Sequence, residues 1–328
     1  MQVVISWDLV AKARQPNSAQ SFENSLTAAV DNVLLSHRRH QTADMLYGGT
    51  ELAVIGTGAT SSTQTITKAS CAPSLWYGNN NALYDIFDPT LTTKRNASPL
   101  SLSSYQVDPT GTSRTLTFGA SVTTTTNDVV TFASTVAGQA YITPPGLSYV
   151  AGLTGGTLFG LSQTTYPTFQ ATQYDAGNAA LTMAAIDKAT ILPLIRGYSG
   201  KMKLLIHPLT FANIAQEEVA RINLVGSQVE GGVRVGYDTI RFTTSAGASV
   251  ECAPSGWVKE GEGWVVPQDG SCKRIGAEDI KLGGPADPSA TWRRIEGQTG
   301  YSLPTYSLQA FFTPEPWKLV KIKNIVNS

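Results

Sequence analysis

The chain has 328 residues, of which 41% are hydrophobic and 15% charged, a composition typical of a folded protein and not of a disordered one. Its 24 Lys and Arg residues balance its 24 Asp and Glu residues. This balance argues against nucleic-acid binding as the main function, because such proteins carry an excess of basic charge. The three cysteines are far apart and form no Cys-x-x-Cys pair, so neither a disulfide framework nor a zinc site is expected. We also expect no signal peptide and no membrane-spanning helix, since no apolar run approaches about 18 residues.

A long helix is predicted close to the start of the chain. Residues 2–13 begin with a β-like pattern, which Pro16 interrupts. Residues 19–47 then contain neither Gly nor Pro, and the Gly48-Gly49 pair supplies a stop signal. Side chains spaced alternately by four and three positions share one face of this helix, apolar in its first half and mixed in its second. A helix of about 29 residues would be about 40 Å long, and such a rod suits an extended subunit better than a compact enzyme.

The middle of the chain is rich in threonine and serine. Short β-like runs within residues 50–143 are separated by turn signals such as Asp108-Pro109, so we expect a small antiparallel β module there. Further along, an apolar strand over residues 202–207 lies between two predicted helices, a pattern that indicates an α/β element. The other predicted segments are a Gly-rich loop over 144–175, helices over 178–196 and 209–223, and β-like segments over 233–282 and 303–326.

Histidines are few, and this limits acid–base and metal chemistry. His37 and His40 share a helix face as a metal pair could, but no carboxylate or cysteine joins them at a suitable spacing. Arg38 and Arg39 would also repel a cation, so we interpret this segment as a solvated or subunit-contacting basic face. His207, at the end of the predicted strand, is interpreted as a structural histidine rather than a catalytic base.

Catalytic and cofactor-binding motifs are absent from the sequence. There is no Gly-x-Ser-x-Gly elbow, and Gly56-Thr57-Gly58 lacks the Gly-Lys-Ser/Thr that completes a phosphate loop. Glu217 and Glu218 are adjacent, so they diverge by about 100° around a helix and do not form a carboxylate pair. We therefore expect no enzyme activity, no metal and no cofactor.

Several aromatic residues stand beside Gly, Pro or charged residues, where a side chain is often exposed. Trp and Tyr are enriched at protein–protein interfaces because they bury a large area at small entropic cost. For any one of them, packing within the core of its own module is an equally good interpretation. They are Trp76, Tyr77, Trp257, Trp264, Trp292 and Trp317.

Short patterns along nearly the whole chain carry a resemblance to a known family. They lie at residues 21–25 and 46–49, 66–78 and 128–132, 155–162, 166–170, 175–181, 207–208 and 272–277. In this order they resemble the major capsid protein of a tailed bacteriophage, with the Hong Kong 97-like fold. The first patterns are similar to the family's long spine helix and its Leu-Tyr-Gly ending, the next to its β insertion, and the last two to its axial domain.

The resemblance implies an α+β chain with a long spine helix, a peripheral domain, an axial α/β domain and a small β-rich insertion. The implied segments are 1–49 (leading strand and spine helix of the peripheral domain), 50–143 (insertion or extended loop), 144–200 (return to the peripheral domain with a second helix), 201–290 (axial α/β domain) and 291–328 (C-terminal strands). Family members carry an N-terminal arm and an extended hairpin loop ahead of the spine helix. Only 18 residues precede the helix here, so the arm and hairpin are missing from this chain, or are much reduced, or residues 50–143 supply the loop; of these we expect an absent upstream segment.

The resemblance also implies a structural major capsid protein and not an enzyme. Many copies, arranged as pentamers and hexamers, would self-assemble into an icosahedral shell that encloses phage double-stranded DNA and contacts it non-specifically. The protein would be located in the virion, after assembly in the cytoplasm of a host bacterium and without a membrane, and scaffold, portal or decoration proteins would be further partners. The residues that we expect at subunit interfaces, chosen by type and position, are Arg38, Arg39, Trp76, Arg293, Arg294 and Trp317.

Two alternatives remain open from the sequence. An encapsulin or a gene-transfer-agent shell would have the same fold and a different cargo. From another class of protein, the β-rich middle of the chain would suit a tail-associated carbohydrate-binding or adhesion module. A hydrolase ranks behind both because the sequence offers few histidines and no nucleophile motif.

Overall fold

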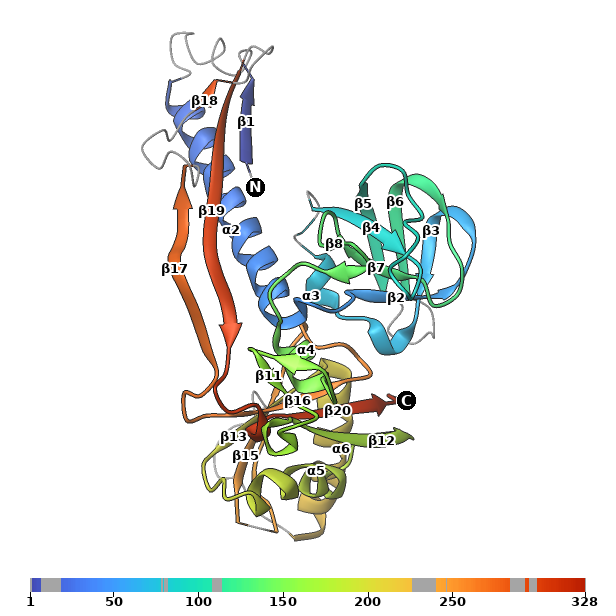
Figure 1. Ribbon diagram of the computed structural model, residues 1–328, viewed down its shortest axis with the longest axis vertical. Helices are drawn as coiled ribbons and strands as arrows, with labels where there is room; N and C mark the ends of the chain where they lie inside the picture. The colour runs from blue at the N-terminus through green and yellow to red at the C-terminus, as the bar shows by residue number, and fades with distance from the viewer. Residues whose placement is uncertain are drawn as a thin grey trace. The chain divides into compact units, whose positions relative to one another are not determined.

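The structure is a computed structural model, which describes residues 2–6, 19–77, 79, 82–107, 114–225, 240–245, 247–283, 293–294 and 300–327. The chain forms two compact units. The first consists of residues 1–43 and 274–310, and the second of residues 44–273 and 311–328. Both units contain helix and strand, so the chain belongs to the mixed α+β class (Figure 1).

The first unit joins one long helix to a sheet. Helix α2 (Ala19–Tyr47) runs unbroken for 29 residues, as the sequence predicts, and most of it belongs to this unit. In the sheet, β19 (Gly300–Phe312) lies between β1 (Gln2–Ser6), to which it is antiparallel, and β17 (Lys273–Leu282). The short strand β18 (Arg293–Arg294) also pairs with β19.

The second unit contains a mixed six-stranded sheet. Its strand order is β12 (Thr172–Ala179), β20 (Val320–Ile325), β16 (Gly263–Pro267), β13 (Met202–Ile206), β15 (Ser249–Pro254) and β14 (Ile240–Thr243). Strand β13 supplies three fully buried side chains, Met202, Leu204 and Ile206, to the core of this sheet. Helices α5 (Met183–Ile195) and α6 (Pro208–Val225) add buried apolar residues to the same core.

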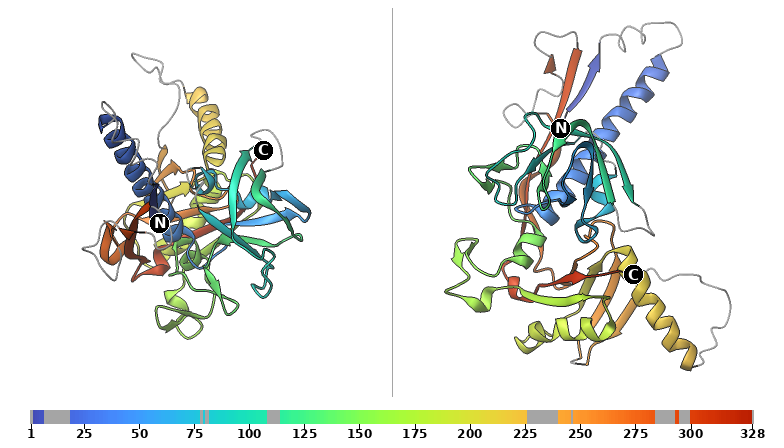
Figure 2. Two further views of the ribbon diagram at one scale, coloured as in Figure 1. Left: turned by 90° about the horizontal axis from the view of Figure 1, so that it is seen from above. Right: turned by 90° about the vertical axis from the view of Figure 1, so that its right-hand side faces the viewer.

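A closed six-stranded barrel is the second β structure of this unit (Figure 2). Around it run β2 (Ala53–Thr57), β3 (Thr60–Ile66), β6 (Arg114–Thr123), β5 (Leu100–Val107), β4 (Leu83–Phe87) and β7 (Val129–Phe132). Alternate residues at the start of β6, such as Arg114 and Leu116, are buried. The first and last strands are neighbours, with Ala53 opposite Val130. The barrel lies within residues 50–143, the range for which the sequence predicts a β module.

Short elements connect the larger ones. They are η1 (Lys68–Ser70), α3 (Pro73–Trp76), β8 (Val136–Ala137), β9 (Ala140–Tyr141), α4 (Leu147–Gly152), β10 (Thr157–Leu158), β11 (Leu161–Ser162), η2 (Pro167–Phe169) and η3 (Pro316–Lys318). Helix α2 ends at the predicted stop signal, where the Gly48 N–H donates to the Asp44 carbonyl at 2.7 Å and Gly49 has φ 77°. That backbone conformation is left-handed, which glycine adopts without strain.

The structure groups the elements on either side of residue 200, and those after residue 290, according to their partners in the fold. Strand β12 and helix α5 precede residue 200, yet they share one core with β13 and β20. The C-terminal strands β19 and β20, expected as one group, belong to different sheets. Local sequence patterns identify strands but not their partners, which here come from distant parts of the chain. Trp292 and residues 233–239 of a predicted β-like segment lie outside the described residues.

Replacing Leu204 should test the core of the six-stranded sheet. Leu204 is fully buried, so we expect Leu204→Ala to lower the free energy of unfolding by about 2–5 kcal/mol, through lost burial and the cavity left behind. Ile195→Ala is the matched control because that side chain is 74% exposed, and its effect should stay within about 0.5 kcal/mol. Denaturant-induced unfolding measures both, and similar losses for the two variants would contradict the assignment of the core.

Candidate functional site

Helix α2 is tied to β19 in the first unit by polar side chains, which we call the clasp. His37 Nδ1 lies 2.8 Å from Thr305 Oγ1, and His37 Nε2 lies 3.1 Å from Ser307 Oγ. Gln41 Nε2 donates to Ser307 Oγ at 3.3 Å. Burial lowers the pKa of His37, so its imidazole is neutral near pH 7, with one nitrogen as donor and the other as acceptor. His37 therefore uses both ring nitrogens inside its own chain, in place of the metal-ligand role considered from the sequence.

Few of the described side chains of the first unit are both apolar and buried. Among its described side chains, the buried apolar ones are Ala43 and Leu303, and partly buried residues of α2 and β17 pack against Leu303. Three larger apolar side chains stay about half exposed, Leu35 at 47%, Ile275 at 45% and Leu308 at 53%. This unit thus presents apolar surface that its own chain does not cover.

The interface candidates from the sequence belong to both units, with the four arginines in the first unit and Trp76 and Trp317 in the second. Arg38 is exposed on α2 and Arg39 is half-buried. Arg293 and Arg294 form β18, opposite Ser302 and Tyr301, and their side chains lie outside the described ones.

The prediction that Trp76 lies at a surface is wrong. Its side chain is 1% exposed, and its ring centroid lies 5.7 Å from that of Tyr84 and 6.2 Å from that of Tyr105. Both tyrosines belong to barrel strands, so the short helix α3 turns Trp76 toward the barrel core. The polar and Gly-rich neighbours of Trp76 in the sequence gave no sign of this packing. Of the other aromatic candidates, Trp264 is fully buried and Tyr77 is 58% exposed.

Trp317 lines a cavity of about 360 Å³ in the second unit. The other lining residues are Thr168, Phe169, Arg196 and Pro314. A second cavity, of about 470 Å³, is lined mainly by uncharged residues that include Tyr141, Tyr149 and Phe159. Neither lining contains a histidine, a cysteine or a carboxylate, which are the groups that acid–base and nucleophilic catalysis use most.

A buried ion pair joins the barrel to the six-stranded sheet within the second unit. Arg114 of β6 and Glu260, in the loop between β15 and β16, lie 3.2 Å apart with side chains 0% and 2% exposed. Lys68 lies 3.5 Å from the other oxygen of Glu260. Nothing local in the sequence indicates this pair, because its members are 146 positions apart.

The same loop also holds the end of α2, the part of that helix that belongs to the second unit. The Tyr47 hydroxyl donates to the Trp257 carbonyl at 2.7 Å and accepts from the Lys259 N–H at 3.1 Å. Lys259 Nζ lies 4.8 Å from the centroid of the Tyr47 ring and 3.2 Å from Glu51 Oε1. We call this region, from Tyr47 to Glu260 and Arg114, the junction.

His207 and Cys71 lie beside the junction, and neither has the character of a catalytic group. His207 Nδ1 accepts the Leu209 N–H at 3.2 Å and so caps the start of α6. Burial, and then the charges of Arg114 and Lys68, lowers the pKa of His207 to about 4. Burial raises the pKa of the Cys71 thiol, which disfavours the reactive thiolate.

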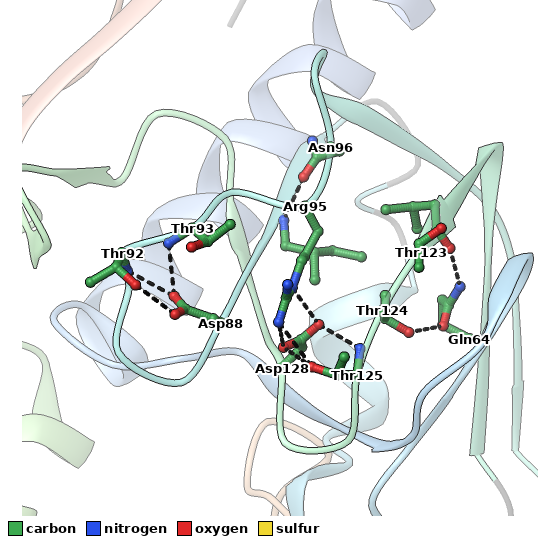
Figure 3. A network of polar contacts seen from close by, with 12 residues as sticks. Gln64, Asp88, Thr92, Thr93, Arg95, Asn96, Thr123, Thr124, Thr125 and Asp128 are labelled. Atoms are coloured by element: carbon green, nitrogen blue, oxygen red, sulfur yellow. Dashed lines mark hydrogen bonds and ion pairs between the residues drawn. The ribbon is translucent and has the colours of Figure 1, made fainter.

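The loops at one end of the barrel form hydrogen bonds and ion pairs among their own polar groups (Figure 3). Arg95 donates to both carboxylate oxygens of Asp128, each at 2.9 Å, and the Thr125 N–H donates to the same carboxylate at 2.7 Å. Hydrogen bonds from the Thr92 hydroxyl and the Thr93 N–H hold the pKa of Asp88 well below its usual range. These contacts make the loops more rigid. The polar groups in them bind one another and not a ligand.

The sequence predicts neither a metal site nor a membrane-spanning helix. In the described part of the chain, no group of three or more His, Cys, Asp or Glu side chains is arranged to hold a metal ion. Over the same residues, no helix combines the length and the apolar character needed to cross a bilayer.

Removing one partner of the buried pair should be costly. Arg114→Met leaves Glu260 with a buried charge that only Lys68 partly compensates, so we expect a loss of about 3 kcal/mol or more in the free energy of unfolding. The double variant Arg114→Met/Glu260→Leu should recover most of that loss. Arg241→Met is the control, because its pair with Glu251 is exposed and should be worth less than about 1 kcal/mol. Equal losses for Arg114→Met and Arg241→Met in urea unfolding would contradict the role of the junction.

His207 should make stability depend on pH. Its pKa is about 4 in the folded chain and 6.5 when unperturbed, so between these values the unfolded chain binds more protons. The contribution of His207 is therefore complete above pH 6.5 and is lost as the pH falls toward 4. His207→Asn keeps a capping side chain but cannot titrate, so the difference in unfolding free energy between wild type and variant should shrink over that interval. A difference that stays constant from pH 7 to pH 4 would contradict this assignment.

No family model matches the chain, and no curated protein matches it. Among solved structures, it is similar to the capsid of cyanophage A-1(L), with a TM-score of 0.42 and 14% identity over 59% of this chain and 63% of that chain. It is also similar to the capsid of cyanophage P-SCSP1u, with a TM-score of 0.30 and 12% identity over 48% and 54% of the two chains. A third neighbour is the SrpI encapsulin of Synechococcus elongatus PCC 7942, with a TM-score of 0.29 and 15% identity over 47% and 53%.

These neighbours are capsid and encapsulin proteins, the classes of protein that the sequence resemblance indicated. The chain matches at most 63% of the length of any of these three. All three TM-scores are below 0.5.

Proposed function

We propose that this chain is a structural shell subunit, the major capsid protein of a tailed bacteriophage with the Hong Kong 97-like fold. The observation that carries the proposal is the character of the first unit. A polar clasp joins its helix to its sheet, and among its described side chains only Ala43 and Leu303 are buried apolar ones. Because small units with little core are only marginally stable alone, this unit gains stability when another copy covers it.

Exposed apolar side chains supply the attraction between copies. Leu35, Ile275 and Leu308 leave about half of their surface in water, and their burial would stabilise a contact by about 25 cal/mol for each Å² removed from water. Each contact is therefore modest. Repeated heterologous contacts around rings close a shell, and the number of contacts for each subunit makes the shell persist.

The proposed fold assigns a role to each part of the chain. The first unit corresponds to the peripheral domain with α2 as its spine helix, the six-stranded sheet to the axial domain and the barrel to the β-rich insertion. The unbroken length of α2 and the order in which the β module and the α/β sheet follow it support this assignment.

The proposed setting is the virion, after assembly of pentamers and hexamers in the cytoplasm of a host bacterium. A net charge of zero supports non-specific contact with the enclosed double-stranded DNA in place of tight nucleic-acid binding. Scaffold, portal and decoration proteins are further proposed partners. The proposal includes no catalytic activity, and the linings of the two cavities described above, which contain no histidine, cysteine or carboxylate, support this.

Electron microscopy of the purified full-length protein tests the proposal. We expect closed shells, or rings of five and six subunits, that increase with protein concentration. Nuclease treatment and extraction of the particles distinguish DNA from an enzyme cargo, which would favour an encapsulin-like shell. A protein that remains monomeric across the whole concentration range contradicts the proposal.

Two leucine variants test whether the first unit provides the assembly surface. Leu308→Gln removes an apolar contact from β19, where the side chain is 53% exposed, and should raise the concentration at which assembly begins by about tenfold. Leu161→Gln is the matched control in the second unit, where the side chain is 43% exposed, and should change that concentration little. Equal effects in light scattering would count against the first unit as the main surface.

A further inference from the structure

Strand β17 is an edge of the sheet in the first unit. The strand order β1–β19–β17 leaves one side of β17 without a strand partner in the part of the chain that the structure describes (Figure 1). The strand is ten residues long, and its first five residues are all exposed. A long edge strand presents a row of N–H and C=O groups that can pair with a strand of another chain.

Four charged residues of β17 are arranged symmetrically about Gly276. Lys273 and Arg274 precede Gly276 by three and two positions, and Glu278 and Asp279 follow it by two and three. In an antiparallel pair of two copies centred on Gly276, Lys273 of each copy faces Asp279 of the other, and Arg274 faces Glu278. Opposite charges directly across a strand pair attract, and like charges there repel. The strand is thus complementary to a second copy of itself.

The complementarity is specific for this register. A shift by one residue in one direction keeps only the pairing of Arg274 with Asp279, and a shift in the other direction keeps only that of Lys273 with Glu278. The centred register also places Ile275 opposite Ala277, both of which are exposed in the single chain. Burial of these side chains across the pair adds an apolar contact to the charge pairs.

We propose that two copies of this chain pair antiparallel along the outer edges of β17, about a two-fold axis at Gly276. The contact is isologous, because each copy offers the same surface to the other, and it closes after two copies. It joins the sheets of two first units into one continuous sheet. The inference rests on the proposed shell function and deepens it, since it identifies the partner of one edge as a second copy.

Within a single chain, the same charged side chains form weaker ion pairs. Arg274 lies 3.4 Å from Asp279 and Lys281 lies 3.1 Å from Glu278, and three of these four side chains are more than half exposed. Exposed ion pairs of this kind contribute little to stability. Asp279 Oδ1 also accepts from Gln309 Nε2 of β19 at 2.8 Å, so pairing between copies exchanges this contact as well.

Gly276 has a separate reason to be glycine. A Cβ atom built there would lie 2.2 Å from the Leu308 carbonyl oxygen of the neighbouring strand β19, so no side chain fits. The tests below therefore leave Gly276 unchanged.

A charge swap tests the pairing. Arg274→Glu alone and Glu278→Arg alone each place two like-charge pairs in the contact, so each should weaken self-association on the order of tenfold or more. The double variant R274E/E278R restores both cross-strand attractions and should return association to the wild-type level. Within a single chain the same double variant makes both ion pairs repulsive, because position 274 then carries a carboxylate beside Asp279 and position 278 a guanidinium beside Lys281. Recovery can therefore arise only between copies.

Sedimentation velocity and electron microscopy of the full-length variants provide the measurement, and circular dichroism verifies that each variant is folded. Loss of association in the single variants and its recovery in the double variant support the pairing. Association of the single variants at the wild-type level overturns it. Loss without recovery in the double variant also overturns it, because the charges would then act within one chain.

Crosslinking between copies separates this inference from the proposed function. In a Cys272→Ser background, Ile275→Cys and Ala277→Cys are placed on separate copies, and a disulfide should form only when the two proteins are mixed, because directly opposed strand residues are close enough for one. Shells that form without this crosslink overturn the pairing and leave the shell function standing. Crosslinked dimers that never build shells support the pairing and count against the shell function.

Discussion

The buried contact between Arg114 and Glu260 is the interaction on which the second unit depends. Removing two charges from water is expensive, and the expense is offset only when they meet each other with good geometry. Here the carboxylate lies 3.2 Å from Arg114 and 3.5 Å from Lys68, and the surrounding loop also bonds through its backbone to residues 69 and 71 beside the barrel. The barrel therefore has one favourable position on the six-stranded sheet, since any other would leave Glu260 without its partner.

The two units of the chain are stabilised in different ways. The second unit has a continuous apolar core, with side chains from β13, β15, β16 and β20 and from both of its helices. In the first unit, hydrogen bonds from His37 and Gln41 hold the helix to β19, and few of the side chains that the structure describes there are apolar and buried. Hydrogen bonds fix geometry while contributing modest net stability. Among the described side chains of the first unit, polar contacts thus fix the geometry, and Leu35, Ile275 and Leu308 stay about half exposed.

Several elements could be predicted from local patterns, and others could not. Helix α2 was predictable because 29 residues without Gly or Pro end at a glycine pair, and β13 because it is a short apolar run between helices. Closure of the barrel was not, since alternation reveals the faces of a strand but not its neighbours. Trp76 was misplaced for a similar reason: its exposure depends on barrel strands that are distant in the sequence. The clasp left a weak signal, because Thr305 and Ser307 are two apart and so share one face of β19.

Because β2 and β7 are neighbours in the barrel, the chain enters and leaves this module at adjacent positions, as in an inserted domain. The chain enters the module at Ala53 and leaves it at Val130. These two residues lie opposite each other in a strand pair, so the two ends of the module are already held together. A module connected in this way can be exchanged for another of any size without stretching the remainder of the fold. A replacement must bring a cation to the place where Arg114 meets Glu260, or Glu260 must change with it.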